Sequence, residues 1–232
     1  MLLTASQQGS TPRQESVRST RAAYGRHVPA NPTATTRYGL AQAPGGLALV
    51  QDVVNTRAAD RPRQADLLHG DVGAAQDWFA DLVQAWSAAT DAPTAEPPQL
   101  SLSDLPRIRN LRETLTQVLR RDEATGVTAA LATTSVRLEL TGDGTAHLAP
   151  GGSAAQWLTG VVLGEIFRAQ ATGEWRRLKV CRNVACSGAF YDLSKNNSRV
   201  WHDVHRCGNI ANLRASRARR RAGGTLLAPP KA

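Results

Sequence analysis

The residues best suited to do chemistry lie between Cys181 and Cys207, a stretch that holds all three cysteines of the chain. Cys181 and Cys186 are separated by four residues, and Cys207 follows after another twenty. An odd number of cysteines fits a disulfide framework poorly, and clustered thiols in a reducing compartment are more often metal ligands or reactive groups. Three thiolates provide three of the four ligands of a tetrahedral zinc site.

Two histidines near the last cysteine are candidates for the fourth ligand. His202 lies five positions before Cys207 and repeats the spacing of the first cysteine pair, so two similar loops would each present two ligands. His205 gives the spacing His-x-Cys, whose side chains converge on one ion less easily. We therefore predict a zinc site whose ligands are Cys181, Cys186, His202 and Cys207. His205 is the alternative to His202 as the fourth ligand.

A site with four protein ligands leaves no coordination position for water or substrate, which favours a structural metal over a catalytic one. The His-x-Glu and Cys-x-x-Cys spacings of zinc nucleobase deaminases do not occur in the sequence. His69 and His147 are isolated, and no nucleophile–base pair or glycine-rich phosphate loop is recognisable. We expect that the protein is not an enzyme.

The net charge of +9 lies entirely on the segment that holds the cysteines. Between Glu174 and Arg221 there are twelve Lys or Arg residues against three acidic ones, whereas the rest of the chain balances sixteen against sixteen. A basic module beside a neutral domain is typical of proteins that bind polyanions. The alternative is a solvated helix face with a few extra arginines.

The sequence "GNIANLRASRARRRA" after the last cysteine predicts a helix rich in Ala, Leu and Arg. The arginines are expected to contact phosphates and Asn209 to contact bases. Arginine-rich segments also bind RNA, and Phe190, Tyr191 and Trp201 would suit either base stacking or a small core around the metal. The predicted nucleic-acid contacts are Arg199, Arg206, Asn209, Arg214, Arg217, Arg219, Arg220 and Arg221.

Hydrophobic periodicity predicts the elements that precede the metal site. Asn55 and Thr56 form a polar pair at the end of the first apolar helix, which we interpret as a helix terminus. Alternating apolar residues about a Gly-Asp-Gly turn predict a β-hairpin over 136–148, and two internal glycines weaken the last helical pattern. A first helix is predicted to begin at residue 47. Three further helices are predicted over 71–88, 102–123 and 153–172.

Composition divides the chain into four parts. Residues 1–44 are expected to be a disordered tail or an over-long predicted start, because too little apolar surface is present to offset the entropy of ordering. Residues 223–232 are expected to be a second disordered tail. Residues 45–173 are expected to form a mixed α/β domain, and 174–222 a zinc module. No run is as long and apolar as a membrane helix, and "MLLTASQQGSTPRQ" lacks the features of a signal peptide, so we expect a cytoplasmic protein without membrane partners.

The stretch "LKVCRNVACSGAFYDLSKNNSRVWHDVHRCGNIANLRASRARRR" resembles the CGNR zinc finger over roughly forty residues. That family has the pattern C-x4-C, an aromatic–aspartate pair with S-x-N-x-S-R, a Trp-Cys pair, and C-G-N-R before a basic helix. Two positions depart from the pattern. His202 replaces the Cys of the Trp-Cys pair, and Ile210 replaces the Arg of C-G-N-R, which removes one cation that Arg214 would compensate one turn later.

Upstream, "LALVQDVVNTR" resembles the opening "ALxxVNT" of the ABATE domain, the N-terminal partner of this finger in stress-induced transcription regulators. The resemblances together imply an α+β protein with a mostly helical ABATE-like domain, a β-hairpin and a small treble-type zinc finger ending in a basic helix. They imply a bacterial DNA-binding transcription regulator. The alternative is a zinc-stabilised RNA-binding or protein-interaction module. A small effector bound by residues 45–172 and a homodimer are further expectations.

Overall fold

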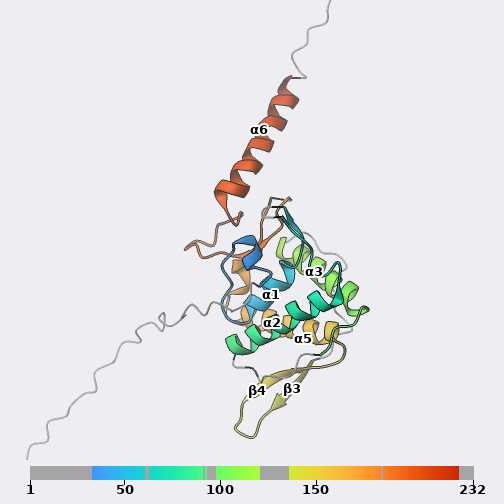
Figure 1. Cartoon of the computed structure of the whole chain (residues 1–232). Coiled ribbons are helices and arrows are strands. Elements are labelled where there is room, and N and C mark those ends of the chain that lie inside the picture. Colours follow the sequence, from blue (N-terminus) through green and yellow to red (C-terminus); the bar gives the residue numbers. More distant parts are fainter. Residues whose placement is uncertain are drawn as a thin grey trace, which may run out of the picture.

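The computed structural model describes residues 33–60, 63–90, 92, 98–120, 136–183 and 185–224 (Figure 1). It has the expected α+β architecture, with a helical body, small antiparallel sheets and a C-terminal finger region. The helices of the body are α1 (Leu47–Val54), α2 (Val72–Thr90), α3 (Asp104–Arg120) and α5 (Ala154–Ala171). The strands pair as β1 (Ala59–Asp60) with β2 (Arg63–Gln64), β3 (Val136–Leu140) with β4 (Ala146–Pro150), and β5 (Leu178–Val180) with β6 (Ala189–Tyr191).

Helix α1 lies at the centre of the molecule. Seven of its eight residues are buried, including Gln51 and Asp52, and it contacts α2, α3, α5 and β6. In the sequence, Leu47, Val50, Val53 and Val54 recur at helical spacing, but a helix surrounded by other elements buries its whole circumference. Every element that positions the finger therefore packs directly or indirectly on α1.

Aromatic side chains join α2 to α5 on one side of this centre. The Phe79 and Trp157 rings meet edge to face at 5.9 Å between centroids, and Trp86 meets Trp157 in the same way at 5.8 Å. Such T-shaped pairs stabilise a core beyond their buried area. On α3, apolar residues such as Leu105, Ile108 and Leu115 are buried, and Arg112 on the same helix is buried too, where it donates to Asp66 and Thr56.

The β3–β4 hairpin lies across α5, and the two glycines inside that helix make the approach possible. A Cβ at Gly164 would clash with Leu148 Cδ1, and one at Gly160 would lie 3.0 Å from Val136 Cγ2. The glycines that weakened the helical pattern in the sequence are thus places where a strand packs closely against a helix. Leu138, which is 77% exposed, lies on the part of the hairpin that remains outside the core.

Residues 33–44 are ordered, contrary to the disordered tail predicted for them. The carboxylate of Asp52 in α1 accepts hydrogen bonds from the backbone N–H groups of Ala34 (3.2 Å) and Thr35 (2.8 Å) and from Trp78 Nε1 (2.9 Å). Burial raises the pKa of this carboxyl, and the hydrogen bonds oppose the shift. A short 3-10 turn, η1 (Thr36–Tyr38), follows and buries Tyr38. Residues 1–32 and 225–232 lie outside the described residues.

The first half of the finger, which is the part before α6, shares the core of the helical body. Leu178, Val180 and Ala189 of the β5–β6 hairpin belong to the same cluster of buried apolar residues as α1, and β5 contacts α3. The second half differs. Helix α6 (Asn209–Gly224), which extends two residues beyond the predicted boundary at 222, projects away from the body (Figure 1).

Candidate metal centre and basic helix

Cys181 and Cys186 lie on a tight loop that connects β5 to β6. The backbone N–H of Cys181 donates to Gly188 O (2.9 Å), and those of Cys186 and Ser187 both donate to Asn183 O (2.8 and 3.0 Å). Ser187 has a positive φ of 49°, a conformation that folds the chain back after the second cysteine. The β-hairpin and this turn together direct both thiols to the same side.

The other two ligands lie on a second turn, formed by residues 202–208. Asp203 caps the single π-type turn η3 (Val204–Gly208), because its carboxylate accepts from the backbone N–H of Arg206 at 3.0 Å. The N–H of Cys207 donates to Asp203 O at 2.9 Å, which brings Cys207 next to His202. Gly208 packs so closely on Trp201 that a Cβ would lie 3.0 Å from the indole Cδ1.

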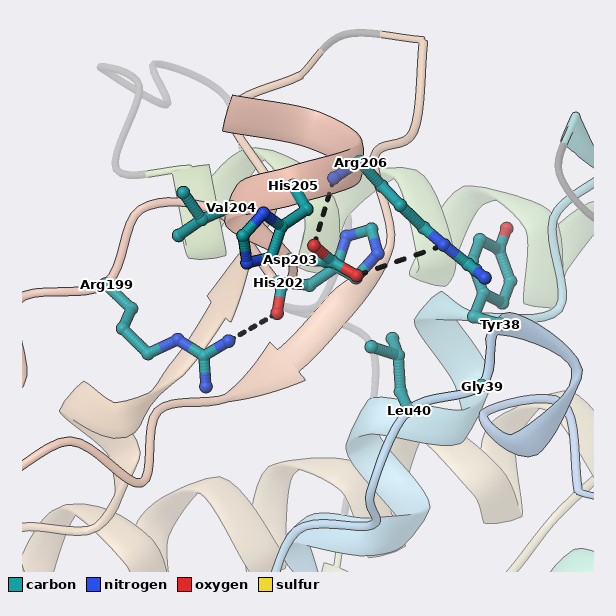
Figure 2. A pocket seen from close by; sticks show the side chains of 9 residues that line it. All are labelled: Tyr38, Gly39, Leu40, Arg199, His202, Asp203, Val204, His205 and Arg206. Atoms are coloured by element: carbon teal, nitrogen blue, oxygen red, sulfur yellow. Dashed lines mark hydrogen bonds and ion pairs between the residues drawn. The ribbon is translucent and has the colours of Figure 1, made fainter. Parts of the chain in front are cut away.

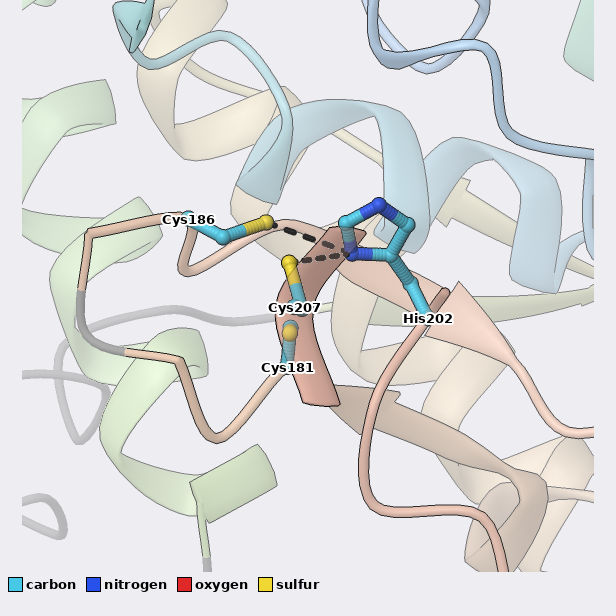
Figure 3. A group of neighbouring side chains, drawn as sticks. All are labelled: Cys181, Cys186, His202 and Cys207. Atoms are coloured by element: carbon cyan, nitrogen blue, oxygen red, sulfur yellow. Dashed lines mark hydrogen bonds between the residues drawn. The ribbon is translucent and has the colours of Figure 1, made fainter. Parts of the chain in front are cut away.

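These two turns bring together the four predicted ligands, Cys181, Cys186, His202 and Cys207, with their ligand atoms all within 4.8 Å of one another (Figure 3). His202 Nδ1 lies 3.3 Å from Cys186 Sγ and 3.6 Å from Cys207 Sγ. Zinc–sulfur and zinc–nitrogen bonds of ordinary length at tetrahedral angles imply an S···N separation of about 3.5 Å. The donor set and its spacing therefore fit zinc, and His205 is not a member of the cluster.

The thiols influence one another's protonation. The hydrogen bond from Cys186 lowers the pKa of Cys181 to about 4, whereas the pKa of Cys186 is raised by that same hydrogen bond and by burial. Burial also raises the pKa of Cys207. Neighbouring thiolates repel one another, so a divalent cation is needed before all three lose their protons. Zinc binding at this site is therefore expected to release protons and to weaken as the pH falls.

A buried carboxylate organises the loop between β6 and the second turn. Asp192 is fully buried and accepts from Lys179 Nζ (2.7 Å) and from the backbone N–H groups of Ser194 and Arg199 (2.8 Å each). Burial alone would raise the pKa of Asp192, but these hydrogen bonds lower it well below its usual range. Lys179 also donates to the carbonyls of Asn197 and Arg199, and Arg177 donates to those of Asp192 and Ser194.

The predicted nucleic-acid contacts fall into two groups. Arg199 donates to the carbonyl of His202 and lies 5.8 Å from the centroid of the Phe190 ring, so it serves the fold of the finger. Arg206 lies 3.9 Å from the Asp203 carboxylate. The others are exposed to solvent along α6: Asn209, Arg214, Arg217, Arg219, Arg220 and Arg221.

Sequence reasoning missed the residue that joins the helical body to the finger. Asn55, at the end of α1, is fully buried, donates to Ala189 O at 3.0 Å and accepts from Ala189 N at 2.8 Å. Gln51 donates to the same carbonyl at 3.2 Å. From α3, Arg120 donates to Ser187 Oγ at 2.5 Å. The signal in the sequence was a polar side chain that ends an otherwise apolar helix.

Residues 177–220 match the family model of the CGNR zinc finger. The match covers β5 and β6, all four ligands and most of α6. No curated protein matches the chain. Together with the ligand cluster, the match identifies the C-terminal region as a zinc-binding finger of this type, as the sequence predicted. None of the described helices is long and apolar enough to span a membrane.

Proposed function

We propose that the protein binds duplex DNA through α6 and regulates transcription in bacteria. The observation that supports this most is the position of the basic helix, which projects away from the helical body (Figure 1) and whose arginines are all exposed. A helix of this size is about 24 Å long, enough to lie across a major groove about 12 Å wide. The stretch "LALVQDVVNTR" in the helical body resembles the ABATE domain, and this resemblance supports a role in regulating transcription.

The arginines of α6 are distributed as a phosphate-binding surface requires. Arg214, Arg217 and Arg221 share one face by their spacing, and Arg219 and Arg220 flank it. Cations at the C-terminal end of a helix also suit its dipole. Asn209 is exposed at the first residue of α6, two positions after the ligand Cys207, and this position would hold it in a fixed orientation for contact with a base.

Duplex DNA is favoured over single-stranded RNA because the aromatic residues of the finger pack inward: Phe190 is buried, and Tyr191 and Trp201 are partly buried. Phe190 is 3% exposed and packs with Cys181 and Cys207 around the metal. Tyr191 packs against the helical core, and Trp201 packs on the metal cluster. Readers of single strands need exposed aromatic faces. The aromatic residues here stabilise the finger.

The salt dependence of DNA affinity tests this proposal. In the triple variant R214Q/R217Q/R221Q, the slope of log K against log salt should fall by about 2.7, because each lost phosphate contact contributes about 0.9. The control is R63Q/R107Q/R137Q, which removes the same charge from exposed positions of the helical body. Fluorescence anisotropy with a labelled duplex measures both. An unchanged slope in the α6 variant, or equal losses in the two variants, would remove α6 from the interface.

A further inference from the structure

A pocket of about 390 Å³ lies beside the metal centre, between the segment that follows η1 and the turn that carries His202 (Figure 2). Its two sides come from parts of the chain more than 150 residues apart. Tyr38 and Leu40 form one wall, and the other is formed by Arg199 and residues 202–206. The pocket is therefore shared by the helical body and the finger.

His202 lines this pocket, and only one of its two ring nitrogens faces the metal site. Its Nδ1 is the atom that faces the sulfurs of Cys186 and Cys207, and Figure 3 shows Nε2 on the other side of the ring. When Nδ1 binds zinc, the proton of the neutral imidazole resides on Nε2. Metal-bound histidines almost always donate this N–H to an acceptor. Among the described residues no acceptor for His202 Nε2 is found, and the residue lines the pocket.

Two further donors that line the pocket are the guanidinium groups of Arg199 and Arg206. Arg199 uses one Nη2 hydrogen bond on the carbonyl of His202, which leaves further N–H groups of its five. Arg206 extends across the opposite side of the opening (Figure 2). The one carboxylate among the lining residues belongs to Asp203, which accepts from the backbone N–H of Arg206 and lies 3.9 Å from its guanidinium group. The surrounding segment carries the whole positive surplus of the chain, which favours an anion.

We propose that this pocket binds a phosphate group, with one oxygen accepting the Nε2–H of zinc-bound His202 and others accepting from Arg199 and Arg206. The phosphate belongs either to the DNA backbone, in which case the site rests on the proposed function and adds a contact beside α6, or to a free phosphate-bearing molecule. Such a ligand would contact the zinc centre and the 38–40 segment at once, linking the helical body to the finger.

The histidine makes this site possible, because a cysteine in its place would hold the metal without an outer donor. H202C keeps four ligands of a kind found in structural zinc sites, with a fourth cysteine in place of the histidine. Its zinc content can be measured before any binding experiment. A second variant, R206Q, touches no metal ligand. A matched control is K195A, which removes one cation from an exposed position of the finger outside the pocket.

The experiment follows the imidazole N–H of His202 by ¹⁵N NMR in zinc-loaded protein while inorganic phosphate is added at constant ionic strength. We expect a saturable shift of the Nε2–H signal in the wild type and in K195A. R206Q should bind phosphate about tenfold more weakly, the effect of one lost charged hydrogen bond. Zinc-loaded H202C should lose a similar factor, measured by calorimetry. No shift up to about 30 mM phosphate, or equal affinity in all variants, would overturn the proposal.

Duplex DNA forms the second arm and separates the two sources of phosphate. A shift of the same signal by DNA assigns the pocket to the backbone. If DNA binds without shifting it while inorganic phosphate does, the site takes a free phosphate-bearing molecule. If phosphate shifts the signal and DNA does not bind at all, the proposed function fails and the pocket stands.

Discussion

The two halves of the finger carry similar charge, but their basic side chains lie in different environments. In the first half, Arg177, Lys179 and Arg199 direct their donors to backbone carbonyls and to the buried Asp192. In the second half, α6 holds its arginines in solvent. The first half also shares the core of the helical body through β5 and β6, whereas α6 projects from it (Figure 1).

This difference shows that the cations of one basic segment can have two roles, internal contacts in one part and exposure to solvent in the other. Cations spaced along a loop satisfy carbonyls that would otherwise be buried without partners. Exposed cations on a projecting helix face solvent or a ligand. A helix rich in Ala and Arg that lacks tertiary packing is marginally stable alone. The zinc centre lies where the two halves meet, and it fixes the start of α6 relative to the body.

Loss of zinc is expected to have the largest effect. C181S should abolish zinc binding, at a cost on the order of 10 kcal/mol of apparent binding free energy in isolated fingers. Because β5 and β6 belong to the helical core, we also expect a lower free energy of unfolding for the body, followed by tryptophan fluorescence in urea. A185S, at an exposed position of the same loop, is the control. Zinc loss with unchanged unfolding of the body would show that the halves are independent.

Next in size is the buried carboxylate of the first half. D192N leaves Lys179, whose side chain is only 16% exposed, opposite an uncharged partner, which should cost about 3 kcal/mol in chemical denaturation at neutral pH. The pKa of Asp192 is lowered in the folded state, so its contribution is present above the unfolded pKa of about 4 and is lost as the pH falls below it. D192N should therefore flatten the decline of stability below about pH 4. The exposed D77N should not, and an equal decline in both would assign the acid sensitivity elsewhere.

The junction between the body and the finger is expected to contribute less. N55A leaves the buried N–H of Ala189 without its acceptor, which should lower the free energy of unfolding by about 1–3 kcal/mol. Urea titration measures the change, with the exposed N196A as reference. If N55A is as stable as the wild type, the contacts of Asn55 do not hold the two parts together.

The smallest effect on stability is expected in the second half. R217Q/R219Q/R220Q should change the free energy of unfolding by no more than about 0.5 kcal/mol, because exposed side chains away from packing contribute little. The same protein should lose DNA affinity. The comparison between the halves fails if this variant unfolds as readily as D192N, since α6 would then be part of the cooperative fold.

The zinc ligands were predictable from sequence because metal ligands come in pairs on short loops, and spacing alone identifies such pairs. Local periodicity likewise predicted the helices of the body and the hairpin. The choice of His202 over His205 needed only the repeated x4 spacing, and the cluster contains His202.

What could not be predicted depends on partners distant in sequence. The order of residues 33–44 comes from Asp52, and the role of Asn55 comes from a strand that begins 134 residues later. The internal contacts of Arg199 follow from the fold of the loop that contains it. The reason for the two glycines inside α5 is visible only in the structure, where the β3–β4 hairpin packs closely on them.

Hydrogen exchange measured by mass spectrometry, with and without duplex DNA, tests the central claim most directly. Without DNA, peptides that contain β6 should exchange as slowly as those of α1, and peptides from α6 should exchange fast. DNA should slow exchange in α6 and leave α1 and β6 unchanged. The account is contradicted if DNA leaves α6 unprotected, or if β6 exchanges as fast as α6 in the zinc-loaded protein.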